Sequence, residues 1–567
     1  MQNKNSLINL YKIFRRVLNI SEINLRSRSI TVFFLLIMAH PAFSYQSSAN
    51  KDYADALKLN HVNIEIFDVF DSTESFYKYR IAKLANVLHI NTRPSVVRRE
   101  LLFLSDSMLT PIRTMESANN LRELGTFQRV HFSIDTVNNT YGDITVNVKD
   151  HFSTDIATSF SVEGGSIRAG LGFHEFNLAG RGYILRIDAS KRADRSFKKA
   201  VFINPRFLGT RFRNRMDYIK FKDAELQYFG LNKFFYSQEI RWDMGIDYQK
   251  FSGKQYTYLS SDNYIKSDYS LRQFQTSYGK YFGKQTRFRI GLKHVFKDEY
   301  WIDPAKRDNS HDWKSHKIST TFGGIRRKIA VKHNIDMADI EEDVHTGFLF
   351  NTGIGFEIPE RGTNTHRQIY TLRALSAKSI TPDDNVFFEV THGRIHQKRA
   401  EIEKITNVRF TYFTTRFANQ TIAAKIELTD LDTPYPSKQE FLGETTGLRG
   451  YENRAFIGQR RLLINLEDRI FSNIQFWFIR LGGSLFIDSG KIWGEDKNFG
   501  AEDWHTGVGF GVRLGIPKFT EGIVRIDFAF NLDKNKFSSL SISKGSYFNV
   551  LYPIEIGVQN FGRFITN

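Results

Sequence analysis

The chain has 567 residues, a formal net charge of +18 and no cysteine. Without cysteine it can form neither a disulfide framework nor a metal centre with thiolate ligands. No run reaches the roughly 18 consecutive apolar residues of a transmembrane helix, and the mean hydropathy is −0.38. Aromatic residues nevertheless make up 14% of the chain. A transmembrane β-barrel reconciles these values, because only half of each strand faces lipid and aromatic side chains form its interfacial girdles.

The first segment is typical of an export signal. Basic residues such as Arg15, Arg16 and Arg28 precede the apolar run 32–39, and small residues follow at 42–44. The apolar run is too short to span a membrane but fits the hydrophobic region of a signal peptide. We therefore expect residues 1–44 to be a cleaved signal peptide.

Residues 55–150 predict a small α+β domain. The expected elements are strands at 62–66, 130–134 and 144–148 and helices at 95–104 and 111–124. Gly125 follows the second helix, where a C-cap glycine belongs. The order is strand, helix, helix, strand, strand, with residues 71–94 inserted after the first strand.

From residue 151 to residue 548, alternating segments separated by turns dominate. Residues 524–531 alternate apolar with polar side chains, and residues 507–516 alternate apolar side chains mostly with glycine. This period of two indicates strands with one lipid-facing and one polar face. The glycine row lacks the following helix of a nucleotide-binding loop, so we interpret it as space for a loop inside a barrel. At roughly 25 residues for each strand with its loop, the region predicts a transmembrane antiparallel barrel of sixteen strands.

Two motifs in the last quarter of the chain pair a basic loop tip with acidic strand positions. The loop tip consists of Gly447, Leu448, Arg449, Gly450 and Tyr451. Asp488 shares the polar face of the strand at 479–488, and Glu467 shares the polar face of the strand that follows the loop. Both acids should point into the barrel lumen. We expect Arg449 to pair with Asp488, with Glu467 as a second partner.

At these residues the chain resembles the BamA/TamA superfamily of outer-membrane assembly and translocation barrels, the bacterial surface antigen family. That family carries an [V/L]-R-G-[F/Y] motif on a loop folded into the barrel and an F-x-D-x-G motif on a lumen-facing strand. Residues 448–451 and 486–490 match the two motifs without substitution. The turn at 177–182 is similar to the family's "NL.G.G" turn after the second strand.

The small domain resembles a POTRA domain. Residues 121–127, Leu-Arg-Glu-Leu-Gly-Thr-Phe, are similar to the "LR.L..F" signature before the second POTRA strand. Only one such unit fits in this chain. The resemblance implies a sheet edge that accepts an extended client strand by β-augmentation or docks a partner.

The closing seam of the barrel should lie between its first and last strands. Leu540, Ile542 and Phe548 share one face of a segment that resembles the family's C-terminal β-signal, which ends in an aromatic residue. Gly545 should weaken this strand because it offers no cross-strand side chain. A weak seam could open and template an incoming strand. The first strand is expected at 156–162.

Residues 549–567 form an extension beyond the point where barrels of this family usually stop. It could fold into the lumen, extend the last strand or hang free.

The sequence favours neither an enzyme nor a cofactor. It contains no G-x-S-x-G elbow and no H-E-x-x-H motif. His392 and His396 are four residues apart along a strand, about 13 Å, which is too far to share a metal ion. The positive charge fits lipopolysaccharide phosphates or acidic clients, whereas no recognised module supports nucleic-acid binding.

The resemblance implies an outer-membrane barrel, with its POTRA-like domain in the periplasm, that inserts, assembles or translocates polypeptides. The expected partners are unfolded client polypeptides, the outer membrane with its lipopolysaccharide, and a periplasmic accessory protein. Two alternatives stay open: a dedicated exporter of the two-partner type and a structural surface barrel.

Overall fold

The computed structural model describes most of the chain. The described residues are 57–551 without 139–140, 164–165, 193–194, 303–309, 337–339, 363–364, 399 and 495–501. The predicted signal peptide at 1–44 and residues 552–567 of the predicted extension lie outside them. No helix among the described residues is long and apolar enough to cross a membrane.

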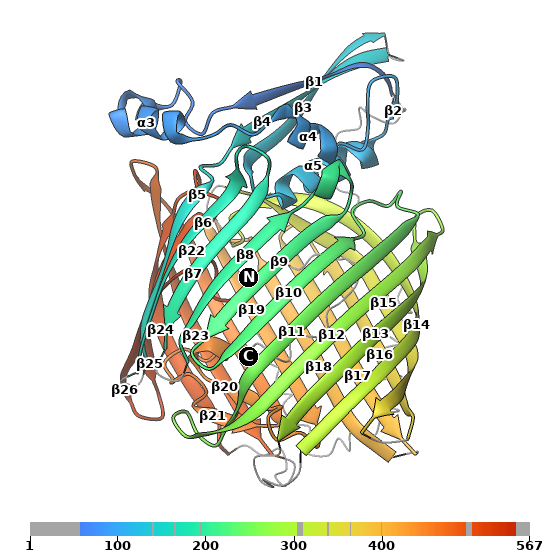
Figure 1. The fold of residues 1–567 in the computed structure, drawn as a ribbon. Helices are drawn as coiled ribbons and strands as arrows, with labels where there is room; N and C mark the ends of the chain where they lie inside the picture. Colours follow the sequence, from blue (N-terminus) through green and yellow to red (C-terminus); the bar gives the residue numbers. More distant parts are fainter. Residues whose placement is uncertain are drawn as a thin grey trace, which may run out of the picture. The chain divides into compact units, whose positions relative to one another are not determined.

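The first described part of the chain is a four-stranded sheet with helices packed on it (Figure 1). Its elements are β1 (Leu57–Phe67), η1 (Ser75–Lys78), α3 (Arg80–Leu88), α4 (Pro94–Glu100), β2 (Met108–Leu109), α5 (Pro111–Glu123), β3 (Phe127–Asn138) and β4 (Tyr141–Asp150). The strand order is β2-β1-β4-β3, in which β1 and β4 run parallel. Leu59, Leu121 and Ile144 are fully buried in its core. The helix α3 lies in the segment that the sequence indicated as an insertion.

The helix expected at 95–104 is shorter than predicted. It ends at Glu100, and Leu101 takes an extended conformation with φ −69° and ψ 140°. Leu101 and Phe103 are nevertheless only 5% and 2% exposed. The extended segment buries both because alternate residues of an extended chain share a face, whereas the helical spacing seen in the sequence cannot distinguish this arrangement from another helical turn.

The rest of the described chain is a closed antiparallel barrel of 20 strands among the residues that the structure covers. Its strands are β5 (Thr154–Glu163), β6 (Ser166–Leu178), β7 (Tyr183–Lys191), β8 (Phe197–Asn204), β9 (Arg213–Phe221), β10 (Ala224–Lys233), β11 (Trp242–Tyr258), β12 (Tyr264–Phe282), β13 (Arg287–Ile302), β14 (Ser310–His333), β15 (Glu341–Arg361), β16 (Arg367–Ser379), β17 (Asp384–Gln397), β18 (Ala400–Thr414), β19 (Gln420–Asp432), β22 (Arg460–Phe476), β23 (Ile479–Trp493), β24 (His505–Gly515), β25 (Ile523–Asn531) and β26 (Lys536–Lys544). β26 pairs with β5 and closes the barrel.

The predicted number of sixteen strands is therefore wrong. The prediction assumed a uniform length for each strand with its loop, but the strands differ widely. β8 and β9 have 8 and 9 residues, whereas β14 has 24. Because strands such as β8 and β9 are short, the same stretch of sequence contains more strands than a uniform length would allow.

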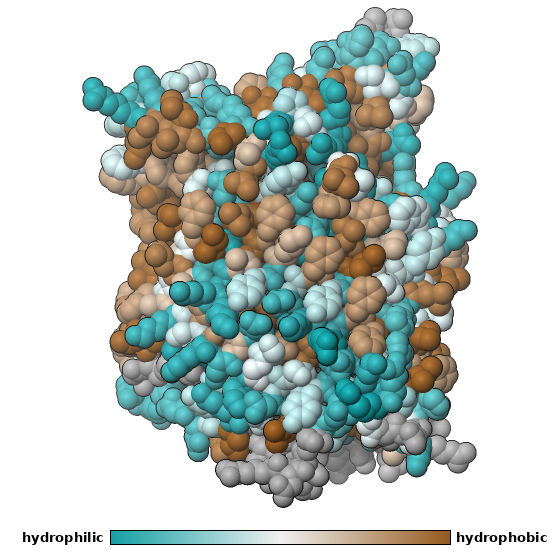
Figure 2. Space-filling model, viewed as in Figure 1, coloured by the Kyte–Doolittle hydropathy of each residue, from teal (hydrophilic) through white to brown (hydrophobic). Residues whose placement is uncertain are grey.

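The barrel wall alternates as a membrane barrel requires. On β23 the large apolar side chains Leu481, Leu485 and Ile487 are exposed outward, while Phe486 and Asp488 are buried on the inner face. Figure 2 shows apolar side chains gathered on the upper half of the wall and hydrophilic ones along its lower part. Such an exterior suits a lipid bilayer.

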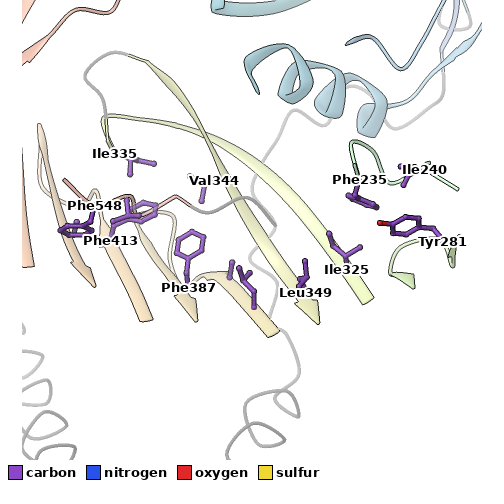
Figure 3. Close-up of a cluster of buried hydrophobic side chains, with 14 residues drawn as sticks. Phe235, Ile240, Tyr281, Ile325, Ile335, Val344, Leu349, Phe387, Phe413 and Phe548 are labelled. Atoms are coloured by element: carbon purple, nitrogen blue, oxygen red, sulfur yellow. The ribbon is translucent and has the colours of Figure 1, made fainter. Parts of the chain in front are cut away.

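The lumen is filled at one end by a hydrophobic cluster (Figure 3). The β10–β11 connection contributes Phe235 and Ile240, the β14–β15 connection contributes Ile335, and the segment after β26 contributes Phe548. Phe413 of β18 is fully buried among them. Connections that fold inward thus form a core inside the barrel.

Candidate functional site

The connection between β19 and β22 folds into the lumen and carries the loop-tip motif. It contains a hairpin of β20 (Glu440–Leu442) and β21 (Phe456–Gly458) and the short helix η3 (Glu444–Thr446). Leu448 and Arg449 are fully buried, and Tyr451 is 4% exposed. An arginine without solvent contact requires compensating charge nearby.

The structure brings Arg449 together with both acids named from the sequence. Its Nε and Nη2 donate to the two carboxylate oxygens of Asp488 on β23, at 2.6 and 3.0 Å. Its Nη1 donates to Glu467 on β22 at 2.8 Å. The guanidinium group therefore makes a bidentate pair with Asp488 and a second ion pair with Glu467. This geometry suits the planar side chain of arginine better than that of lysine.

Two aromatic rings enclose the same guanidinium group. Its central carbon lies 3.4 Å from the ring centroid of Phe486 and 4.0 Å from that of Tyr547. The Tyr547 hydroxyl donates to the carbonyl oxygen of Glu444 in the inserted loop, at 2.6 Å. Because Arg449 is fully buried, these cation–π contacts stabilise its position in addition to the two ion pairs.

No motif in the sequence identifies Tyr547 or Glu444 as site residues. Tyr547 lies in the segment that the sequence pattern predicts to be the last strand. The Glu444 carboxylate accepts from the backbone N–H of Gly450 at 3.0 Å, and no spacing in the sequence indicates this contact.

Glycines give the loop its shape and the space it occupies. Gly447 and Gly450 have φ angles of 118° and 89°, a region that favours glycine. On β24, a methyl group at Gly507 would overlap the carbonyl oxygen of Arg449, and one at Gly509 would overlap the ring of Phe486. Within the glycine row of β24, Gly507 thus leaves room for the loop, as the pattern predicted, and Gly509 leaves room for the ring that packs on Arg449.

The seam between β26 and β5 is the weakest pairing of the barrel by number of register positions. Among the residues that the structure describes, four are paired, including Leu540 with Val162 and Ile542 with Phe160. The β14–β15 pair spans twenty register positions. Leu540 and Ile542 therefore lie at the seam, as their sequence pattern suggested.

The seam assignment of Gly545 and Phe548 is wrong. β26 ends at Lys544, and Gly545 has a φ of 77°, which turns the chain away from the strand direction. Phe548 is 6% exposed in the lumenal cluster and Val550 is fully buried. Burial of these apolar side chains outweighs continuation of the strand. The first residues of the predicted extension, up to Leu551, lie with this inward segment.

The inward segment is attached to the same charge network as Arg449. Arg469 Nη2 donates to the carbonyl oxygen of Phe548 at 2.7 Å, and Arg469 Nε lies 3.2 Å from Glu467. Glu467 thus contacts both Arg449 and Arg469. The inserted loop and the C-terminal segment 545–551 are coupled through one carboxylate.

A cavity of about 690 Å³ lies in the lumen beside the seam. Side chains of β5, β6, β7, β8, β19 and β26 line it, together with Glu444, Gly447 and Tyr547 of the two inserted segments. The seam strands and the inserted segments therefore border one shared space.

One group of side chains could hold a metal ion. Single ligand atoms of Asp155, His174 and Glu521 lie within 4.8 Å of one another. Lys544 donates to Asp155, however, and Arg186 Nη2 lies 3.5 Å from Glu521. Because these cations balance the carboxylates, we interpret the group as ion pairs that cross the seam.

The small sheet domain contacts the barrel at the β6–β7 turn, where the sequence showed the "NL.G.G" resemblance. Asn177 Nδ2 donates to Thr92 Oγ1 at 2.9 Å, and Arg93 N donates to the carbonyl oxygen of Gly180 at 2.9 Å. In the connection from β4 to β5, burial lowers the pKa of His151 to about 4. The sheet ends in two edge strands, β2 with 2 residues and β3 with 12, so β3 offers the longer edge at an end of the strand order.

Neither a family model nor a curated protein matches the chain. Solved structures similar to it include CdiB from Escherichia coli, at 9% identity and a TM-score of 0.43, covering 89% of this chain and 93% of that chain. CdiB from Acinetobacter baumannii has 9% identity and a TM-score of 0.39, covering 91% and 96%. BamA from Haemophilus ducreyi lacking POTRA domains 1-3 has 11% identity and a TM-score of 0.35, covering 86% and 84%.

Proposed function

We propose that this chain is an outer-membrane barrel that inserts or translocates polypeptides, with its small sheet domain, a POTRA-like unit, on the periplasmic side. The observation that carries the proposal is the Arg449 network. It holds a lumenal loop beside a seam that has four paired register positions in the described part of the chain. A structural barrel needs neither a short seam nor an arginine buried at such cost.

The client would first dock at the edge strand β3. This strand pairs with β4 on one side only. Its other edge presents backbone groups to which an extended polypeptide can add as a further strand. The domain is anchored to the barrel on two sides, by Asn177 with Thr92 and by the ion pair of Arg122 with Asp343 on β15, so a docked client would be held at the end of the barrel that this domain contacts.

The seam would then accept the client. Separation of β26 from β5 breaks few backbone hydrogen bonds and exposes two strand edges. The inserted loop and the 690 Å³ cavity lie directly behind these strands. They give the client a polar space on the lumenal side while its strand pairs with the open edge. Nothing in this sequence of events requires a cofactor.

A seam cross-link tests the proposal. Ser161 and Ser541 are register partners across the seam, and the chain has no native cysteine, so a Ser161→Cys/Ser541→Cys pair can form a single disulfide. Asn407 and Thr429 are register partners within the wall and serve as the control pair. The readout is quantitative proteomics of the outer membrane and the culture supernatant.

We expect the seam disulfide to deplete several outer-membrane barrels, with recovery on reduction, while the control disulfide has no effect. A secreted protein that disappears in a strain lacking the chain, but whose amount the seam disulfide does not change, would support the dedicated exporter instead. Unchanged proteomes in a strain lacking the chain would contradict both and leave a structural barrel.

A further inference from the structure

The helix α3 presents an apolar surface that the proposed function does not use. Ile81, Leu84, Val87 and Leu88 are 52%, 55%, 80% and 66% exposed, and Ile90 after the helix is 59% exposed. We call these five residues the α3 surface. Side chains at spacings of three and four lie on one face of a helix, so the α3 surface is continuous.

The opposite face of α3 is fixed to the domain. Ala82 is fully buried. Asn86 accepts from the backbone N–H of Phe70 at 3.1 Å and donates to its carbonyl oxygen at 2.9 Å. The helix is therefore held in one orientation, and the exposed apolar face is not the result of an unattached helix turning freely.

The α3 surface continues into the membrane-facing wall of the barrel. Tyr79, which precedes α3, has its ring centroid 6.5 Å from that of Trp477 in the β22–β23 turn. Phe476 and Trp477 are 67% and 50% exposed and stacked on each other.

The residues around the α3 surface suit a lipid headgroup region. Tyrosine and tryptophan are enriched where a membrane meets water. The sequence of α3, RIAKLANVL, contains no acidic residue, and Lys78, Arg80 and Lys83 are exposed beside the apolar face. An apolar face bordered by basic residues is the pattern of a helix that lies in a membrane interface and binds anionic phospholipids.

We propose that the α3 surface docks on anionic phospholipids of the bilayer leaflet nearest the small domain. The contact would hold this domain against the membrane next to the barrel. The inference rests on the membrane insertion in the proposed function but not on polypeptide transport. A second copy of the chain and a client peptide are the competing occupants of the surface.

Lipid quenching measures the contact directly. Because the chain has no native cysteine, Val87→Cys can carry one fluorescent label in lipid nanodiscs that contain phosphatidylglycerol and nitroxide-labelled lipid. Leu104→Cys is the matched control, because Leu104 is 60% exposed in the same domain but not on the α3 surface. Leu485→Cys on the outer wall of β23, 56% exposed, reports barrel insertion.

We expect quenching at positions 87 and 485 but not at 104. Leu84→Asp together with Leu88→Asp should abolish quenching at 87 and leave 485 unchanged. Replacement of phosphatidylglycerol by phosphatidylcholine, or added salt, should weaken the signal at 87.

Quenching at 485 without quenching at 87 would overturn the α3 proposal alone. No quenching at 485 would overturn membrane insertion and with it the proposed function. Shielding of position 87 that depends on protein concentration, or that appears only with an added client peptide, would assign the surface to that occupant and contradict lipid docking.

Discussion

The wall formed by β11–β15 and the seam formed by β26 and β5 hold the same barrel together in different ways. β11–β15 have 16 to 24 residues each and pair over long registers. β26 and β5 have 9 and 10 residues and share four register positions, with side-chain ion pairs such as Lys544–Asp155 beside them. Long backbone pairing holds the wall in addition to its ion pairs, such as Arg289–Asp243, whereas the seam has little backbone pairing and depends more on side chains and inserted segments. The seam is therefore the place where single substitutions should matter most.

The largest effect should come from Arg449→Ala. It leaves Asp488 without its charge partner in a buried site and leaves Glu467 with Arg469 as its remaining close partner, and breaking a buried pair costs about 3–5 kcal/mol. We expect the barrel to insert normally while residues 444–458 become accessible to protease and function is lost. Arg460→Ala, which removes a half-exposed pair with Asp430, should cost at most about 1 kcal/mol. A fully active, normally inserted Arg449→Ala protein would contradict the proposed role.

A second substitution weakens the side-chain part of the seam. Lys544→Met removes the cation that contacts the buried Asp155 carboxylate, and loss of a hydrogen bond to a charged group costs about 1.5–3 kcal/mol. Hydrogen exchange of the β5 amides should become roughly tenfold faster or more. Lys332→Met on β14 is the control in the wall, because it removes an exposed hydrogen bond to the carbonyl oxygen of Pro382 and no pair with a buried carboxylate, so exchange of the wall amides should change little. If the amides of the seam and of the wall exchange at equal rates in the wild type, the seam is not the weaker part of the barrel, and the contrast between the two regions is contradicted.

A third substitution tests the space behind the seam. A methyl group at Gly507 would overlap the carbonyl oxygen of Arg449, whereas one at Gly483 would lie 3.6 Å from the nearest atom. Overpacking of this kind costs about 1–3 kcal/mol. Gly507→Ala should therefore displace the loop and expose Tyr451 to solvent, measurable by protease cleavage, while Gly483→Ala should not.

The smallest effect concerns the connection between the small domain and the barrel. Burial lowers the pKa of His151 to about 4, below its value of about 6.5 in an unfolded chain. The unfolded form then binds a proton that the folded form does not, so stability falls as the pH drops below about 6.5. The loss between pH 7.5 and 5.5 should be on the order of 1 kcal/mol. Thermal unfolding of the wild type and of His151→Gln, which should lack this dependence, checks it.

The sequence predicted the local parts of this structure well. The period-two alternation identifies which face of β23 is polar, so Asp488 could be placed in the lumen, and the glycine row of β24 could be interpreted as space for a loop. The number of strands could not be predicted, because it was estimated from a uniform strand length, whereas strand lengths range from 8 residues in β8 to 24 in β14. The inward turn at Gly545 depends on what Phe548 and Val550 contact in the lumen, and those contacts come from segments hundreds of residues away.

The position of Tyr547 against Arg449 has a consequence for biosynthesis. Tyr547 follows every barrel strand that the structure describes, yet its ring lies on one side of the guanidinium group and its hydroxyl contacts Glu444. The inserted loop can therefore reach its final packing only after the last strand has been synthesised and has turned inward. A nascent or truncated chain that lacks residues 545–551 would hold the loop incompletely. The contact between Tyr547 and the loop therefore forms only in chains that have been synthesised beyond the final strand.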